Sequence, residues 1–398
     1  MVEWRNHVLA INMMDGNCEL VCRSDPMEDD RIQVECSTGF AQARALAEGL
    51  LDAGAQPGPF DRLAWFEALH ASAFPGARPL ILQARGPGDA RAWLFLAREK
   101  PGHLTGIANW YSFTYRPQFH GAPDAATKRA LLAAIARALR GHGSRLRLHP
   151  IVDDETADAA LIAAAFREGG WHVVTRAMSR KRLLHLPPGT SFADYWAERP
   201  GALRSTFRRK QQQHPLTLRI HDTLDDALWS AFEQIFARSW KPDGDDFAFL
   251  RAFAETEAAA GRLRLGIGHG ESGPSAVELW TVDQGTAYIH KLAFDERFAD
   301  HSPGTQLSYA MFRHAIDMDK VRCIDFGTGD NDYKANWMPR SVPMRQIDAF
   351  DLARPTSWRG AMMAHLSAIA QPDERGTSRK AERGRRAALA AVPEQGDR

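Results

Sequence analysis

The chain has 398 residues, of which 44% are hydrophobic, so it can hold two or three globular domains with their own cores. Fifty Lys and Arg residues stand against 49 Asp and Glu residues, and the resulting formal charge of +1 predicts no nucleic-acid partner. The N-terminus has no apolar signal-peptide core, and no apolar run is long enough to span a membrane. We therefore expect a cytoplasmic protein without a transmembrane segment.

Cysteine spacing and common enzyme motifs exclude several kinds of site. The four cysteines, Cys18, Cys22, Cys36 and Cys323, match no zinc pattern with two close pairs. The motifs HExxH, GxSxG and GxxxxGK[ST] are absent. The sequence therefore predicts no metal site and lacks the signatures of the enzyme classes that these motifs mark.

The first half of the chain predicts alternating strands and helices after an N-terminal extension, residues 1–59. That extension has a mixed pattern and ends in the linker-like run "DAGAQPGPF". The elements predicted from residue 60 onward are a helix, the strands "RPLILQAR", "RAWLFLARE" and "TGIANWYSFTY", the helix "AATKRALLAAIARALRG", the strand "RLRLH", the helix "TADAALIAAAFREGG" and the strand "WHVVTRAM".

The second half repeats this order of elements. Its predicted elements are the strands "RLRLGIGHG", "SAVELWTVD" and "TAYIHKLAF", a helix that begins in "HSPGTQL", and the strand "RCIDFG". We therefore expect an α/β (α+β mixed-sheet) fold in two tandem lobes, residues 60–188 and 189–370. The tail, residues 371–398, is polar and charge-mixed, which predicts disorder.

The helix that begins in "HSPGTQL" has a start that suits an anion. Ser302 is a good N-cap residue, and Pro303 suits the first helical position. The N–H groups of Gly304, Thr305 and Gln306 would then be free at the positive end of the helix dipole. A capped helix without a ligand explains the same residues, so this pattern alone leaves both interpretations open.

The run "AVELWTV…GTAYIHKLAFDE…SPGTQL…VRCIDFGTGDNDYKANW" resembles the GNAT-fold acyltransferases, in particular the branch associated with cellulose biosynthesis (CelD-like). "LTGIANWYSFTYRP" resembles the first half of that branch, which is related to the FemAB-type double-GNAT transferases. The resemblance covers residues 60–352 and is strongest over residues 275–340. It implies two tandem GNAT-like lobes, with acyl-CoA as co-substrate between the strands "TAYIHKLAF" and "CIDFG" and its pyrophosphate at "SPGTQL".

The residues that the resemblance implies for acyl-CoA binding are Leu292, Ser302, Gly304, Thr305 and Gln306. The loop departs from the usual pattern, because it has a proline and one glycine where two glycines and a basic or Gln residue are usual. In the first lobe the equivalent segment, "HGAPDAATKRALL", places an acidic residue where an anion would bind. We therefore expect that lobe to be degenerate and to shape the acceptor cleft without binding CoA.

Two residues are candidates for the base that acyl transfer requires. Strand alternation places His290 on one face with Tyr288, Leu292 and Phe294, and its ordinary pKa suits a base near neutral pH. A hydrogen-bonded core histidine is the alternative. Asp325 lies in an apolar strand, where a carboxylate must be paired. It could orient His290, act as base itself, or cap the following turn.

The segment "GDNDYKANW" supplies three further candidates. By resemblance, Tyr333 would protonate the leaving thiolate, although a packing role is the alternative. Asp330 corresponds to the family's Gly-Asp turn, and Lys334 could bind a phosphate or a substrate carboxylate. We assign Asp330 and Lys334 to substrate binding.

The sequence as a whole favours an acyl-CoA-dependent N- or O-acyltransferase that resembles acetyltransferases. It would act by direct attack in a ternary complex, without a metal, on an unidentified acceptor such as a small molecule, a saccharide or an amine. A FemAB-like aminoacyl-tRNA-dependent transferase and a non-catalytic binding or scaffold protein on a GNAT fold are the alternatives. The oligomeric state stays open.

Overall fold

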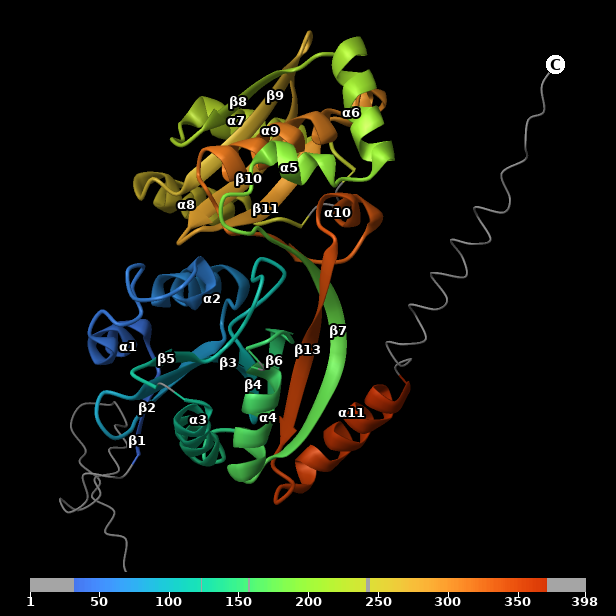
Figure 1. Cartoon of the computed structure of the whole chain (residues 1–398). Coiled ribbons are helices and arrows are strands. Elements are labelled where there is room, and N and C mark those ends of the chain that lie inside the picture. The colour runs from blue at the N-terminus through green and yellow to red at the C-terminus, as the bar shows by residue number, and fades with distance from the viewer. Residues whose placement is uncertain (1–31, 123, 157, 241–243, 371–398) are drawn as a thin grey trace, which may run out of the picture.

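The computed structural model describes residues 32–122, 124–156, 158–240 and 244–370 (Figure 1). The predictions for residues 1–31 and for the tail, residues 371–398, lie outside these ranges. The strands are β1 (Gln33–Ser37), β2 (Arg78–Arg85), β3 (Arg91–Lys100), β4 (His103–Gly106), β5 (Gln118–His120), β6 (Arg145–Val152), β7 (His172–His185), β8 (Thr217–His221), β9 (Leu263–Gly270), β10 (Gly273–Asp283), β11 (Thr286–Phe294), β12 (Cys323–Thr328) and β13 (Arg340–Phe350).

Helices cover the strands and connect them. The α-helices are α1 (Phe40–Ala47), α2 (Leu63–Ala73), α3 (Ala125–Leu139), α4 (Asp158–Glu168), α5 (Phe192–Ala197), α6 (Gly201–Gln213), α7 (Asp226–Ala237), α8 (Phe247–Ala259), α9 (Pro303–Asp317), α10 (Asp332–Trp337) and α11 (Trp358–Ala370). The short 3-10 helices are η1 (Pro59–Asp61), η2 (Glu296–His301) and η3 (Pro355–Ser357). In the part of the chain that the structure describes, no helix is long and apolar enough to cross a membrane.

All strands belong to one mixed sheet, which confirms the predicted mixed α/β fold. The order along the sheet is β1-β2-β3-β4-β6-β13-β7-β12-β11-β10-β9-β8, and β5 pairs with β3. Each half contains one parallel pair, β4 with β6 and β11 with β12, and the helices α3 and α9 make the respective crossovers. The two halves therefore repeat the same local order from opposite ends of the sheet.

The two halves exchange their last strands. β7, from the first half, pairs with β12 and β13 of the second half, and β13 pairs with β6 of the first half. Figure 1 shows β7 and β13 side by side, joining the upper and lower parts of the molecule. The two predicted lobes thus share one continuous sheet, in which the 14-residue strand β7 of the first half pairs with two strands of the second. The lobe boundary between residues 188 and 189 stays a prediction.

The segment "TGIANWYSFTY" differs from its predicted strand. Only its first two residues belong to β4, and residues 107–117 form a loop. Tyr111, Phe113 and Tyr115 are buried from irregular backbone, so their β-forming tendency misled the sequence-based prediction. The Tyr115 hydroxyl donates to the Phe95 carbonyl oxygen at 2.7 Å, which fixes the loop to β3.

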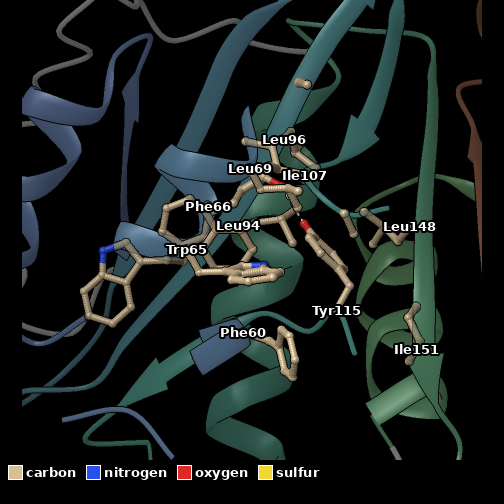
Figure 2. Packing of buried hydrophobic residues seen from close by; sticks show 14 of the residues in the cluster. Phe60, Trp65, Phe66, Leu69, Leu94, Leu96, Ile107, Tyr115, Leu148 and Ile151 are labelled. Atoms are coloured by element: carbon tan, nitrogen blue, oxygen red, sulfur yellow. Dashed lines mark hydrogen bonds between the residues drawn. The ribbon is translucent and has the colours of Figure 1, made fainter. Parts of the chain in front are cut away.

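The largest core cluster contains residues from both halves. Phe66 on α2 stacks on Phe95 with 4.1 Å between ring centroids, and Figure 2 shows Phe66 among Leu69, Leu94 and Leu96. Trp65, on the same helix, contacts Phe249 and Phe253 of α8 at centroid distances of 5.6 and 5.4 Å. A shared core and exchanged strands make the two halves one folding unit.

Residues 189–370 expressed alone should therefore not unfold cooperatively. In that fragment β12 loses β7, and β13 loses both of its neighbours, which leaves unpaired strand edges that favour aggregation. Circular dichroism during thermal unfolding, with residues 32–370 as the control, measures this. A soluble monomeric fragment that melts in one sharp transition would contradict the single folding unit.

Candidate functional site

A cavity opens where β11 and β12 separate. The two strands pair only over residues 286–288 and 323–325, and beyond these residues they diverge. A cavity of about 500 Å³ lies between the diverging ends. Its lining residues are Trp110, Phe113, Trp240, Ile289, His290, Lys291, Leu292, Phe294, Ala299, Ser302, Gly304, Thr305, Phe326, Gly327, Thr328, Asn331, Tyr333 and Lys334. Seven of the ten residues predicted for the site line this cavity: His290, Leu292, Ser302, Gly304, Thr305, Tyr333 and Lys334.

A β-bulge at His290 changes the predicted alternation along β11. Ile289 pairs with Trp280 and Lys291 pairs with Leu279, so His290 is the extra residue. Tyr288 and His290 both contact Phe113, with 6.2 and 5.2 Å between ring centroids, so these two share one face as predicted. Leu292 and Phe294 pack with α9 instead, because the bulge inverts the alternation after His290.

His290 lies among aromatic rings at the wall of the cavity. Its ring centroid is 4.9 Å from that of Phe253 and 5.2 Å from that of Phe113, and its Nε2 is 2.8 Å from Thr281 Oγ1. Burial, together with the charge of Lys291, lowers the pKa of His290 to about 3. The imidazole is neutral at pH 7 and takes up a proton poorly. These contacts fit the core-histidine alternative better than a general base.

Lys291, the next residue along β11, is paired with a carboxylate. Its ammonium forms an ion pair with Asp245 and lies 4.7 Å from the centroid of the Tyr111 ring. Burial lowers the pKa of Lys291, and the hydrogen bond to Asp245 opposes this shift. Tyr111 Oη also donates to Asp245 at 3.1 Å, so Tyr111 joins the loop of the first half to this pair at the cavity wall.

Asp325 forms a buried ion pair with a residue of the first half. Lys181 Nζ on β7 donates to Asp325 Oδ2 at 2.6 Å, and the Gly327 N–H donates to Asp325 Oδ1 at 2.9 Å. Lys181 also donates to the Phe113 carbonyl oxygen at 3.2 Å. Of the three roles considered for Asp325, these bonds match the turn cap. Within the described ranges, no hydrogen bond joins Asp325 to His290.

The start of α9 presents two free amide groups to the cavity. Ser302 occupies the N-cap position with φ 52° and ψ 49°, and its side chain makes no capping bond, because a capping residue normally has extended dihedrals. The Gln306 N–H bonds to the Ser302 carbonyl oxygen at 3.2 Å. The N–H groups of Gly304 and Thr305 have no acceptor among the described residues. Two of the three amides predicted to be free are thus available.

Gln306 does not line the cavity. Its side-chain Nε2 donates to the carbonyl oxygens of His214 and His301 at 3.0 and 3.1 Å, so it holds the preceding loop in place. Leu292, Ser302, Gly304 and Thr305, the other residues predicted for acyl-CoA, all line the cavity.

Tyr333 on α10 begins a chain of hydrogen bonds that leads into the core. Its Oη is 2.7 Å from Ser308 Oγ, and Ser308 in turn donates to Glu278 Oε1. The single proton of Ser308 is directed at Glu278, so Tyr333 must donate to Ser308. Trp280 Nε1 donates to the other oxygen of Glu278 at 2.6 Å. Burial, with the charge of Glu278, raises the pKa of Tyr333, which keeps its hydroxyl protonated.

Lys334 and Asp330 occupy different surroundings. Lys334 Nζ lines the cavity and donates to the carbonyl oxygens of Phe326 and Thr328, both at 2.8 Å. Burial lowers the pKa of Lys334 to about 8. Asp330 does not line the cavity. Although burial opposes the shift, hydrogen bonds from Ser341 and Arg182 lower the pKa of Asp330 and hold it in the turn.

Several residues of the site escaped the sequence analysis. Glu278 carries the same signal that drew attention to Asp325, a carboxylate within an apolar strand, and this signal could have found it. Trp110 and Phe113 come from the loop that was predicted as a strand. In the described residues, no group of three or more His, Cys, Asp or Glu side chains could hold a metal ion.

Comparisons with known proteins show what this chain is similar to. Residues 197–335 match the sequence model of an acetyltransferase (GNAT) domain. No curated protein matches the sequence. One similar solved structure is FemX, with 10% sequence identity and a TM-score of 0.48 over 69% of this chain and 89% of that chain. Another is a tandem GNAT protein from the clavulanic acid biosynthesis pathway, with 14% identity and a TM-score of 0.46 over 80% of this chain and 98% of that chain. The structure of L-PGS from Bacillus licheniformis is also similar, with 10% identity and a TM-score of 0.44 over 69% of this chain and 85% of that chain.

The buried pair of Asp325 and Lys181 predicts a stability effect that separates structure from catalysis. Asp325→Asn should reduce the free energy of unfolding by roughly 3–5 kcal/mol, because it leaves the Lys181 charge buried without its partner. The double variant Asp325→Asn with Lys181→Met should recover most of that loss. Urea denaturation of the two single variants and the double variant measures the coupling.

Asp226→Asn, which breaks an exposed pair with Arg251, is the matched control and should leave stability nearly unchanged. Additive losses in the double variant would show that Lys181 and Asp325 do not stabilise each other.

Proposed function

We propose that the protein is an acyl-CoA-dependent N- or O-acyltransferase that acts by direct attack in a ternary complex on a small amine or hydroxyl acceptor. The divergence of β11 and β12 at the start of α9 carries this proposal, because it forms the cavity within the residues that match the acetyltransferase domain. When bound, acyl-CoA supplies the thioester whose acyl group is transferred. The assignment to the CelD-like branch rests on the sequence motifs alone.

The start of α9 would bind the pyrophosphate. The free N–H groups of Gly304 and Thr305 lie at the positive end of a 15-residue helix and at the cavity wall. An added Cβ at Gly304 would lie 3.3 Å from the Phe294 ring, so a side chain here would crowd the wall. Leu292 and Phe294 supply apolar surface beside these amides.

The acceptor would approach from the side that the first half builds. Trp110 and Phe113 line the cavity from the loop of residues 107–117. Gly327, at φ 63°, has no space for a Cβ, which would lie 2.8 Å from the Phe113 ring. The first half therefore packs directly on the end of β12 and completes the wall of the cavity.

The chain from Tyr333 to Glu278 offers a path for the acceptor's proton. As the acceptor's proton moves to Tyr333 Oη, Tyr333 gives its own hydroxyl proton to Ser308 Oγ. Ser308 in turn gives its hydroxyl proton to Glu278 Oε1. The hydrogen-bond directions favour this acceptor role over the donor role first expected for Tyr333. Lys334 holds a proton at Nζ with a pKa near that of a thiol, which suits the leaving group.

The cysteines support direct transfer over an acyl-cysteine route. The described residues include Cys36 and Cys323, and neither lines the cavity. Burial raises the pKa of the Cys323 thiol to about 12, so it is a poor nucleophile at neutral pH.

Thr305→Asp should weaken CoA binding while keeping the fold. An acidic residue in the first turn is favourable for the helix itself, but it repels a pyrophosphate at the same place. Thr305→Asn has nearly the same shape without the charge and is the matched control. A thermal-shift titration with CoA and acetyl-CoA should show a rise in Tm for the native protein and for Thr305→Asn, and a Kd at least roughly tenfold weaker for Thr305→Asp.

No shift of the native protein at millimolar ligand would remove the acyl-CoA donor from the proposal. The aminoacyl-tRNA-dependent transferase and the scaffold protein would then be the functions to test.

Tyr333→Phe and Glu278→Gln should each lower kcat by roughly 10²-fold or more, with CoA affinity nearly intact. Since the two residues act through one proton path, the double variant should be no slower than either single variant. Lys334→Met lies outside this path, so its effect should multiply with that of Tyr333→Phe. Steady-state kinetics on an acceptor found by screening amines and saccharides measure these effects.

Ser308→Ala interrupts the same path and serves as the second test if Glu278→Gln unfolds. Independent, multiplying effects of Tyr333→Phe and Glu278→Gln would show that no common path exists.

A further inference from the structure

The helix α11 exposes an apolar stripe on the side that faces away from the sheet. Its members, each between 54% and 79% exposed, are Trp358, Met362, Met363, Leu366 and Ile369. They make up half of the large hydrophobic residues that are exposed in the described part of the chain. Such a concentration on one helix marks an interaction surface.

The opposite face of α11 is fixed to the sheet. Ala361 and Ala364 are buried against Val174 of β7 and Phe350 of β13. Ser367 Oγ accepts a hydrogen bond from Arg176 Nη1 at 2.9 Å. Small residues therefore contact the sheet, while the large apolar residues point outward. The contacts of the small residues hold the helix in this orientation, so the stripe stays exposed. In Figure 1, α11 lies on the outer side of β7 and β13.

The surroundings of the stripe are cationic. The helix carries no acidic residue. Because successive residues of an α-helix are 100° apart around its axis, Arg359 lies near the middle of the exposed face. The nearby carboxylates of Asp348 and Asp351 are buried and already paired with arginines. An anionic partner is thus the complementary one.

We propose that α11 lies flat on an anionic membrane surface, with its stripe at the boundary between headgroups and acyl chains. Arg359 would reach the lipid phosphates, since a long basic side chain buries its stem and keeps its charge in the polar layer. This inference does not rest on the proposed transferase activity.

A second copy of the chain fits this surface less well than a membrane does. A helix packed on the stripe would cover Arg359, and the helix offers no carboxylate to pair with it. The segment that follows, residues 371–398, contains seven Lys and Arg residues and five Asp and Glu residues, so its charge adds to the attraction.

Flotation of the full chain with vesicles tests the proposal. Vesicles of phosphatidylcholine with about a third phosphatidylglycerol should bind the protein, and vesicles of phosphatidylcholine alone should bind it much more weakly. The double variant Met363→Ser with Leu366→Ser should bind the anionic vesicles at least roughly tenfold more weakly, because it removes two apolar side chains from the stripe. Its Tm should stay unchanged, since both side chains are exposed.

Met318→Ser changes an exposed methionine that lies 70% accessible at the end of α9, and it should keep full binding. Truncation after residue 370 should keep the preference for anionic vesicles, because the stripe remains. Equal binding of both vesicle types, or undiminished binding by the double variant, would overturn the proposal. A dimer in sedimentation velocity that the double variant abolishes would show instead that a second copy covers the stripe.

Discussion

The pairing of β7 with β13 is the constraint on which the rest of the structure depends. Each strand comes from a different half of the chain, and the two pair along nearly their whole lengths. Buried ion pairs reinforce this region: Lys181 of β7 with Asp325 of β12, and Arg176 of β7 with Asp348 of β13. A buried charge tolerates the loss of its partner poorly, so these pairs fix which strands lie next to each other. The two halves consequently fold as one sheet.

The same constraint builds the cavity. β12 pairs with β11 up to Asp325 and is held on its other side by β7, so the divergence of β11 leaves a gap that the sheet cannot close. The Lys181 ammonium, which bonds to Asp325 and to the Phe113 carbonyl oxygen, connects this gap to the loop of the first half. The first half thus contributes to the site, because it supplies one wall and one counter-charge.

Burial assigns different roles to polar groups that look alike in the sequence. His290 and Glu278 lie on neighbouring strands, yet the histidine is held neutral among aromatic rings, while the carboxylate ends a hydrogen-bond chain that reaches Tyr333 at the cavity. The helix α11 packs on Val174 and Phe350, at the other end of the joined strands from Lys181. The proposed membrane surface and the cavity therefore belong to one rigid framework.

The sequence by itself determined the features that depend on neighbours along the chain. The strand "TAYIHKLAF", the start of α9 at Pro303 and the helices α3 and α4 follow from period, capping and helix-forming residues. The motif resemblance pointed to the strands between which the cavity lies. Only the tertiary structure decided the strand exchange, the bulge at His290 and the partner of Asp325. Strand order, register and ion pairing depend on residues more than a hundred positions apart, as between Lys181 and Asp325. Local sequence patterns do not specify such distant partners, because each strand could pair with several others until the whole core is packed.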